Sequence, residues 1–273
     1  MKNLIIRTIT GAIFVAFIIS SAILSPEAFA VLFLFMAIPA YLEFQRLINK
    51  ENNIQHTIPG VLTALIVYSL FALYALCYTQ KESLWLIVPV VAILTSIIVL
   101  THKQYRLRYI LSNVGGIILV VSPLALLNLY LNPELIPGYH TPWFLLGMFV
   151  ILWMHDTFAY LTGSLFGRHP LYKRISPKKS WEGSIGGFGF AIIAAYIISI
   201  FSPVLECWHW ITIAIIVTIF GTIGDLAESW LKRRAGVKDS GSILPGHGGV
   251  LDRFDSILLV SPIVYLLILF AIS

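Results

Sequence analysis

Charged residues are scarce in this chain of 273 residues. Asp, Glu, Lys and Arg make up only 11% of it, whereas soluble domains carry roughly 25%. Long apolar runs take their place, and a helix needs about 20 mostly apolar residues to cross a bilayer. The short alternating segments that mark outer-membrane barrel strands are not found in the sequence. The composition therefore argues against a soluble domain and predicts an all-α, polytopic membrane protein.

Cysteine is also scarce, since only Cys77 and Cys207 occur. Two cysteines are too few for a cysteine-rich metal site. Both fall near the outer face, where an oxidising compartment would permit a bond between them. Nothing in the sequence sets the geometry of such a bond, so we favour two unpaired thiols.

The apolar runs indicate about nine transmembrane helices. They cover about 8–25, 28–45, 58–78, 83–101, 109–131, 142–165, 183–202, 208–227 and 256–272. We divide the chain into an N-terminal transmembrane region, 1–140, with five helices, and a C-terminal region, 141–273, with four helices and two long loops.

The placement of positive charge predicts the orientation. When nine helices are threaded in order, all of the 18 Lys and Arg residues except Lys81 fall on one side of the membrane. Basic residues accumulate in cytoplasmic loops, so that side is cytoplasmic. The N-terminus is then cytoplasmic, the C-terminus periplasmic, and both long loops face the cytoplasm. The net charge of +5 is thus explained by topology rather than by nucleic-acid binding.

The first long loop, about 166–182, is basic and polar. It offers cationic groups and hydroxyls that could hold phosphate oxygens. The candidate residues are Ser176, Lys178, Lys179 and Glu182. The alternative interpretation is a basic loop that only determines topology.

Carboxylates gather at the cytoplasmic ends of the later helices. An acidic residue inside an apolar span costs a few kcal/mol and usually has a partner or a task. Asp225, Asp252 and Asp255 form an oxygen-ligand set of the kind that Mg²⁺ prefers, and Mg²⁺ needs only one or two protein carboxylates beside substrate phosphates. Asp156 is a further candidate, although it could simply bond to nearby backbone or to His155.

The second long loop, about 228–255, combines a glycine turn with basic groups. Gly248 and Gly249 follow His247 and allow close approach of the backbone to a ligand. The other polar candidates around this turn are Ser229, Lys232, Arg233, Lys238, Asp239 and Arg253. Together they indicate a metal–polyphosphate site, and the pattern is not a Walker A loop. His247 could instead stabilise the turn alone.

One acidic residue in the first region receives a different interpretation. Glu43 and Arg46 are three residues apart at the end of the second apolar run, a spacing that places them on one helix face. We interpret them as an ion pair at the membrane interface rather than as a site.

The second half of the sequence resembles the CDP-diacylglycerol synthase (phosphatidate cytidylyltransferase) family. The resemblance rests on Ser229-x-aliphatic-Lys232-Arg233, on Lys238-Asp239, and on Leu244-Pro-x-His247-Gly-Gly with Asp252-Arg-x-Asp255. The segments 156–160, 176–183 and 224–229 are also similar to that family. The resemblance to the family is dense over about 156–256 and only general before that.

The resemblance implies a nucleotidyltransferase. CMP would pass from CTP to phosphatidic acid, giving CDP-diacylglycerol and pyrophosphate with Mg²⁺ as cofactor, as the first committed step of phospholipid synthesis. It also implies a multi-pass protein of the bacterial inner membrane, surrounded by lipids, with its active site facing the cytoplasm; a homodimer is compatible with this. The implied catalytic set is Asp225, Lys232, Arg233, Lys238, Asp239, Asp252, Arg253 and Asp255, with metal at Asp225, Asp252 and Asp255. The implied substrate-binding set is Ser176, Lys178, Lys179, Glu182, Ser229, His247, Gly248 and Gly249.

A membrane transporter for an anionic solute is the competing hypothesis. Such proteins also use basic, glycine-rich cavities and broken helices. However, the polar groups of this chain lie in loops on one side, with few near the middle of the bilayer and no inverted repeat. This distribution favours the enzyme.

Overall fold

The computed structural model describes residues 2–49, 58–101, 106–135, 142–202 and 205–272. These residues are mainly helical, with one two-stranded antiparallel sheet. The chain divides into two compact units. The first holds residues 1–132 and 234–254, and the second holds 133–233 and 255–273. A segment from late in the sequence therefore folds with the N-terminal helices.

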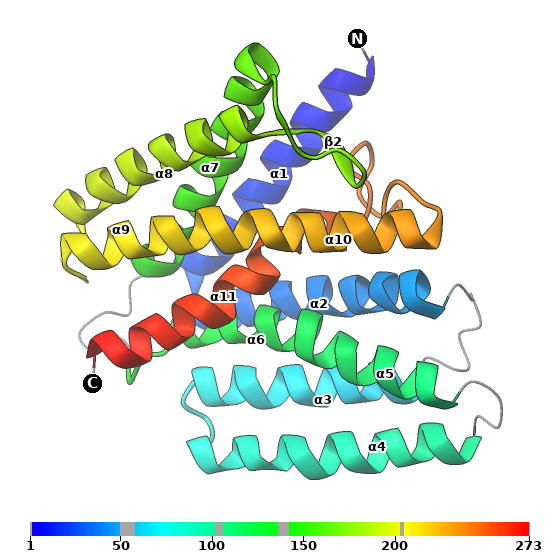
Figure 1. Ribbon diagram of the computed structural model, residues 1–273. Helices are drawn as coiled ribbons and strands as arrows, with labels where there is room; N and C mark the ends of the chain where they lie inside the picture. The colour runs from blue at the N-terminus through cyan, green and yellow to red at the C-terminus, as the bar shows by residue number, and fades with distance from the viewer. Residues whose placement is uncertain (1, 50–57, 102–105, 136–141, 203–204, 273) are drawn as a thin grey trace. The chain divides into compact units, whose positions relative to one another are not determined.

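The first unit is a helical bundle (Figure 1). Its helices are α1 (Lys2–Leu24), α2 (Pro26–Asn49), α3 (Ile58–Ala75), η2 (Lys81–Leu86), α4 (Ile87–Thr101), α5 (Arg106–Gly116), η3 (Ile117–Val121) and α6 (Ser122–Leu129). Buried polar groups connect neighbouring helices of this bundle. The Tyr68 hydroxyl donates to the Ala30 carbonyl over 2.9 Å, and the Gln45 amide donates to the Ser112 carbonyl over 2.8 Å. Such bonds are needed because buried polar groups without partners are costly.

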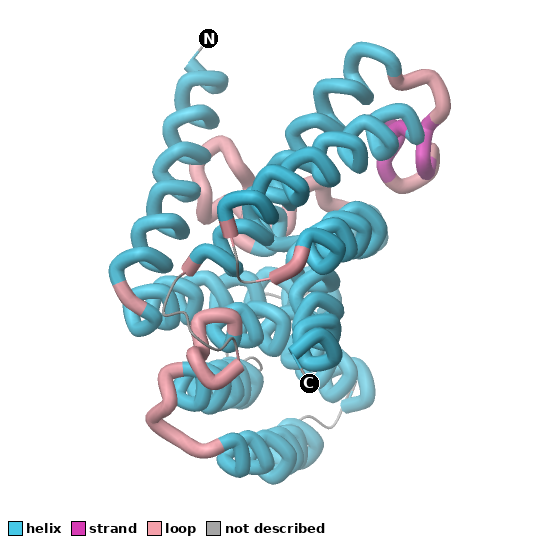
Figure 2. Tube along the Cα trace, turned by 90° about the vertical axis from the view of Figure 1, so that its left-hand side faces the viewer, coloured by secondary structure: helices cyan, strands magenta, loops and turns pink. Residues whose placement is uncertain are grey.

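The second unit contains a long helical hairpin followed by further helices. Its elements are α7 (Trp143–Phe166), β1 (Pro170–Tyr172), β2 (Ser176–Ser180), α8 (Trp181–Phe201), α9 (Cys207–Ile216), η4 (Val217–Gly221), α10 (Thr222–Ala235) and most of α11 (Leu251–Ile272). The two strands lie between α7 and α8, as Figure 2 shows. Helices α7 and α8 approach closely, because a Cβ at Gly187 would lie only 2.7 Å from the His155 carbonyl oxygen.

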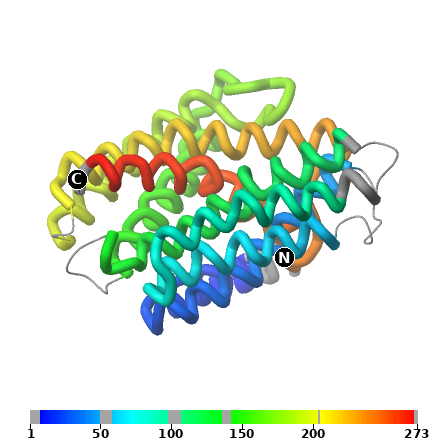
Figure 3. The backbone as a smooth tube through the Cα atoms, turned by 90° about the horizontal axis from the view of Figure 1, so that it is seen from below, coloured from blue at the N-terminus to red at the C-terminus, as the bar shows by residue number. Residues whose placement is uncertain are grey.

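Both long loops of the sequence analysis are more ordered than expected. The loop at about 166–182 contains the β1–β2 hairpin, which is a small departure from an all-α fold. Helix α9 continues through the π-helical turn η4 into α10 as one long helix, which Figure 3 shows along its length. It ends at Ala235 rather than near 227. An ion pair between Glu228 and Lys232, one helical turn apart, supports this extension.

The prediction of a multi-pass helical membrane protein is confirmed. Seven described helices are long and apolar enough to span a membrane. They are Pro26–Asn49, Ile58–Ala75, Leu107–Leu129, Trp143–Phe166, Trp181–Phe201, Cys207–Ala235 and Leu251–Phe270. The other two predicted runs form shorter apolar helices, Thr8–Leu24 and the 15-residue α4. Cys77 and Cys207 are both exposed, and the Cys77 thiol donates to Asn132 Oδ1 over 3.8 Å.

Candidate functional site

Two adjacent lysines on β2 have different surroundings. Lys178 is exposed, whereas the Lys179 ammonium forms an ion pair with the Asp225 carboxylate on α10. The difference follows from the strand, since successive side chains of a β-strand point to opposite faces. Ser176, at the other end of the strand, is partly buried. The structure therefore separates two lysines that the sequence presents as equivalent.

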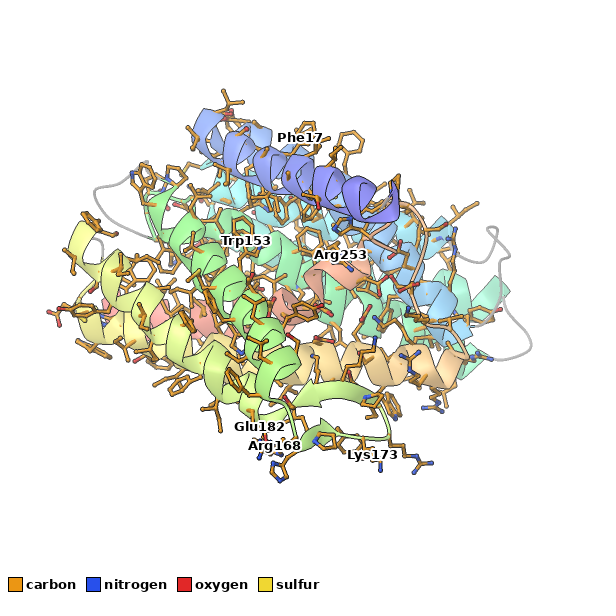
Figure 4. All side chains as sticks on the ribbon, turned by 90° about the horizontal axis from the view of Figure 1, so that it is seen from above. Phe17, Trp153, Arg168, Lys173, Glu182 and Arg253 are labelled. Carbon is orange, nitrogen blue, oxygen red and sulfur yellow. The ribbon has the colours of Figure 1, made fainter. Side chains whose placement is uncertain are left out.

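The start of α8 holds the hairpin in place. The Ser180 hydroxyl accepts a hydrogen bond from the Gly183 amide over 3.1 Å, as an N-cap does. Glu182 reaches back to the segment before β1, where its carboxylate accepts the amides of Arg168 and His169, each over 3.2 Å. The His169 ring also lies 2.5 Å from it. Glu182 thus binds neighbouring residues of the hairpin. Figure 4 labels it beside Arg168 at this end of the helical hairpin.

Asp225 and Asp255 lie in a carboxylate-rich part of the second unit. One carboxylate oxygen of Asp225 binds Lys179, and the other accepts the Ser229 hydroxyl over 3.3 Å. Asp255, on α11, interacts electrostatically with the carboxylates of Asp225, Glu228 and Asp156. It also interacts with the ammonium of Lys179. One cation therefore lies among several carboxylates.

Close packing of α10 on α11 brings Asp225 and Asp255 together. A Cβ at Gly224 would lie 2.5 Å from the Asp255 carbonyl oxygen, so a side chain at this position would push the two helices apart. Glycine beside Asp225 therefore determines how near the two aspartates can be.

Asp156 and Lys232 have partners of their own. The Asp156 carboxylate lies 3.1 Å from Nδ1 of the buried His155, which is the contact that the alternative interpretation proposed. Lys232 is largely buried and paired with Glu228. An ammonium in this position can stabilise α10. The neighbouring Arg233 is exposed.

The glycine-rich segment belongs to the first unit and forms a tight turn. The His247 amide donates to the Leu244 carbonyl over 2.9 Å, with Pro245 and Gly246 in the central positions. Gly246 has φ +74°, so the arrangement is that of a type II turn. The His247 ring packs against Gly11 of α1, since a Cβ at Gly11 would lie 3.2 Å from its Nε2.

Asp252, in the first turn of α11, organises the same segment. Its Oδ2 accepts the amide of Ser240 over 2.9 Å and that of Gly249 over 2.8 Å. Gly248 has φ +83°, and a Cβ there would lie 2.7 Å from Asp252 Oδ2. These glycines therefore have a structural use inside the segment, in addition to any contact with a ligand. Lys238, Asp239 and Arg253 are exposed around it, and Figure 4 labels Arg253.

Glu43, on α2, binds the glycine-rich segment, and the sequence analysis missed this role. It is fully buried, and its carboxylate accepts the Ser240 hydroxyl over 2.7 Å and the amides of Val250 and Leu251 over 3.1 and 2.8 Å. The interpretation of Glu43 and Arg46 as an interfacial ion pair was wrong, because Arg46 is exposed while Glu43 faces the interior. The only signal for Glu43 in the sequence was its position inside an apolar run.

The predicted site residues thus divide between the two units. The second unit brings together Lys179, Asp225, Glu228, Ser229, Lys232 and Asp255. The first unit brings together Ser240, His247, Gly248, Gly249 and Asp252, with Lys238, Asp239 and Arg253 in the same segment.

The donor chemistry at Asp225 and Asp255 fits a hard cation. Mg²⁺ favours carboxylate oxygen and completes its shell with water and substrate phosphate, so two aspartates on facing helices are sufficient. Among the described residues, no three or more His, Cys, Asp or Glu side chains form a ready-made metal site. Lys179 supplies positive charge at the same place.

These features define a class of protein. Membrane-spanning helices carry paired lysine and aspartate side chains in the second unit, and a glycine turn with polar neighbours lies in the first. Comparison with known sequences then identifies the family. The sequence profile of the cytidylyltransferase family matches residues 5–271, and the chain belongs to this family.

Individual relatives agree with this assignment. The phosphatidate cytidylyltransferase of Staphylococcus saprophyticus is 34% identical over 241 residues, which cover 88% of this chain and 90% of that protein. The protein of the same name from Staphylococcus haemolyticus is 33% identical over 246 residues, covering 87% and 90%. That from Staphylococcus aureus is 32% identical over 266 residues, covering 97% and 98%. The similarity therefore extends well beyond the motif-rich second half.

Proposed function

We propose that this protein is a phosphatidate cytidylyltransferase that converts phosphatidic acid and CTP into CDP-diacylglycerol and pyrophosphate. The similarity to proteins of that name over almost the whole chain is the observation that carries the proposal. The membrane-spanning helices fit a substrate that stays in the bilayer. The basic and acidic groups at the helix ends fit a soluble, highly charged second substrate.

The proposed reaction is a direct displacement. A phosphate oxygen of phosphatidic acid attacks the α-phosphorus of CTP, the bond from this phosphorus to the bridging oxygen breaks, and pyrophosphate leaves. Such a reaction depends on positioning and charge neutralisation rather than on a covalent enzyme intermediate. No nucleophilic Ser or Cys is required of the chain.

We assign roles according to exposure and partners. Lys179 sits beside Asp225 and can turn from this carboxylate to a substrate phosphate. Lys178, Arg233, Lys238 and Arg253 are exposed and can neutralise phosphate oxygens. Arg can fork onto two of these oxygens, whereas Lys acts as a point charge. Lys232, paired with Glu228, acts by positioning.

We further propose that Asp225 and Asp255 hold Mg²⁺. Asp252, the third ligand predicted from the sequence, belongs to the first unit. Bound Mg²⁺ would neutralise charge on the triphosphate and on the departing pyrophosphate. Ser229 supports this arrangement, because its hydroxyl donates to Asp225 and limits the orientations of that carboxylate.

The membrane arrangement is also part of the proposal. Nine spans, with the N-terminus and the active site cytoplasmic and the C-terminus periplasmic, account for the distribution of Lys and Arg. A reporter fused after Ser273 should behave as periplasmic. Cytoplasmic activity of that reporter would contradict the count of nine spans. A homodimer, the remaining expectation, can be tested by the mass of the solubilised protein.

The purified protein, given phosphatidic acid and each of the four nucleoside triphosphates, tests the reaction. We expect CDP-diacylglycerol and pyrophosphate from CTP, and no comparable turnover of ATP or GTP. Equal turnover of ATP, or formation of phosphorylated lipid with a nucleoside diphosphate, would indicate a lipid kinase instead.

A further inference from the structure

Glu43 carries an ionisable group into the interior of the first unit. Its side chain is fully buried on α2, and its two oxygens accept three hydrogen bonds. All three donors come from residues about 200 positions later in the sequence. A buried carboxylate is costly unless such donors satisfy it, so this group fixes the distant segment to α2.

Two of the three donors are amides at the start of α11. The first amides of a helix have no partner within the helix and carry partial positive charge. The amides of Val250 and Leu251 are of this kind, because α11 begins at Leu251. Glu43 therefore caps α11 from another helix and holds its first turn at a defined place against α2.

The third donor, Ser240, links Glu43 to a predicted catalytic residue. The Ser240 hydroxyl donates to Glu43 while its backbone amide donates to Asp252. Gly249 lies between the same groups, since its amide donates to Asp252 and a Cβ there would overlap the Glu43 carboxylate. One small network thus joins the buried carboxylate to the aspartate that begins the Asp252-Arg253 pair.

We propose that Glu43 is a positioning residue of the transferase reaction, which holds residues 240–252 so that Asp252 and Arg253 face the substrates in one orientation. This inference rests on the proposed function. Glu43 does not touch the reacting atoms. It acts by restricting the backbone that carries them, and small displacements of catalytic groups can cost about 10²-fold in rate.

Glu43→Gln is the informative substitution, because it keeps the length of the side chain. The amide nitrogen of Gln cannot accept a hydrogen bond, so at least one of the three donors loses its partner. We expect kcat for CDP-diacylglycerol formation to fall by about 10²-fold, with smaller changes in KM. Glu27→Gln is the matched control, since Glu27 is an exposed carboxylate on the same helix. It should keep kcat within about twofold of the unaltered protein.

Hydrogen exchange gives a readout that does not depend on activity. Amides held by a carboxylate exchange slowly, so the peptide containing Val250 and Leu251 should exchange faster in Glu43→Gln. Peptides from the β1–β2 hairpin, which belongs to the second unit, should not change. A general loss of structure would accelerate both.

Ser240→Ala provides a milder test if Glu43→Gln does not fold. It removes one of the three donors and leaves the backbone bond to Asp252. It should lower kcat by several-fold, and in combination with Glu43→Gln the effects should be less than additive. Unchanged kcat in Ser240→Ala, or a slow Glu43→Gln enzyme with unchanged exchange at 250–251, would overturn the inference. Failure of the proposed function is recognised separately, because the unaltered protein would then form no CDP-diacylglycerol.

Discussion

Lys179 offers the sharpest test of the site, because its neighbour Lys178 serves as a matched comparison. The two lysines are adjacent on β2, but only Lys179 is paired with Asp225. Lys179→Gln keeps a polar, though shorter, side chain and removes the charge. We expect this substitution to lower kcat by about 10²- to 10³-fold, which is the effect of losing one electrostatic stabiliser, about 3–4 kcal/mol.

Loss of stability is too small to account for such an effect. The side chains of Lys179 and Asp225 are 29% and 30% exposed, and a solvent-accessible ion pair contributes about 1 kcal/mol or less. The rate effect corresponds to at least twice that free energy. A large fall in kcat with little change in the melting temperature would therefore assign Lys179 to the reaction.

The assay is CDP-diacylglycerol formation by purified variants in mixed micelles, with kcat and both KM values measured. Lys178→Gln should change kcat by less than about tenfold and act mainly on KM, because an exposed lysine contributes to binding of substrate rather than to the transition state alone. Equal effects of the two substitutions, or a Lys179→Gln enzyme with nearly normal kcat, would refute the reasoning from strand geometry.

Three further substitutions test other parts of the second unit. Asp255→Asn should lower kcat by about 10²-fold or more; near-normal kcat with an unchanged Mg²⁺ requirement would place the metal elsewhere. Gly224→Ala should destabilise the protein by about 1–3 kcal/mol, because its Cβ would strike the Asp255 carbonyl; a normal melting temperature and normal kcat would contradict this. Glu182→Gln should loosen the hairpin and speed hydrogen exchange at Arg168 and His169, and unchanged exchange there would mean that other contacts hold it.

The class of protein and the family pattern follow from the sequence. An apolar run long enough to span a bilayer is a local property, because every backbone group in lipid must pair within its own helix. The motif residues are also local, since Asp225, Lys179 and the glycines at 246–249 are visible as residue types. Their chemistry predicts a site for phosphate and a hard cation before any contact is known.

The limits of the helices were less predictable. The extension of the long helix to Ala235 depends on polar residues that hydropathy alone places in a loop. The β1–β2 hairpin contains several charged residues and has little alternation of apolar and polar residues. Its anchoring depends on Glu182, whose reach back to Arg168 and His169 is a three-dimensional contact.

The sequence by itself determined a multi-pass helical membrane protein and predicted a set of side chains suited to phosphate, because helix length and residue chemistry are properties of short segments. Only the tertiary structure decided which of these side chains meet. It pairs Lys179 rather than Lys178 with Asp225, and it places Glu43 against Ser240, 197 residues away in the sequence. Such contacts depend on how helices pack around small residues and buried charges, and this packing is a property of the whole chain.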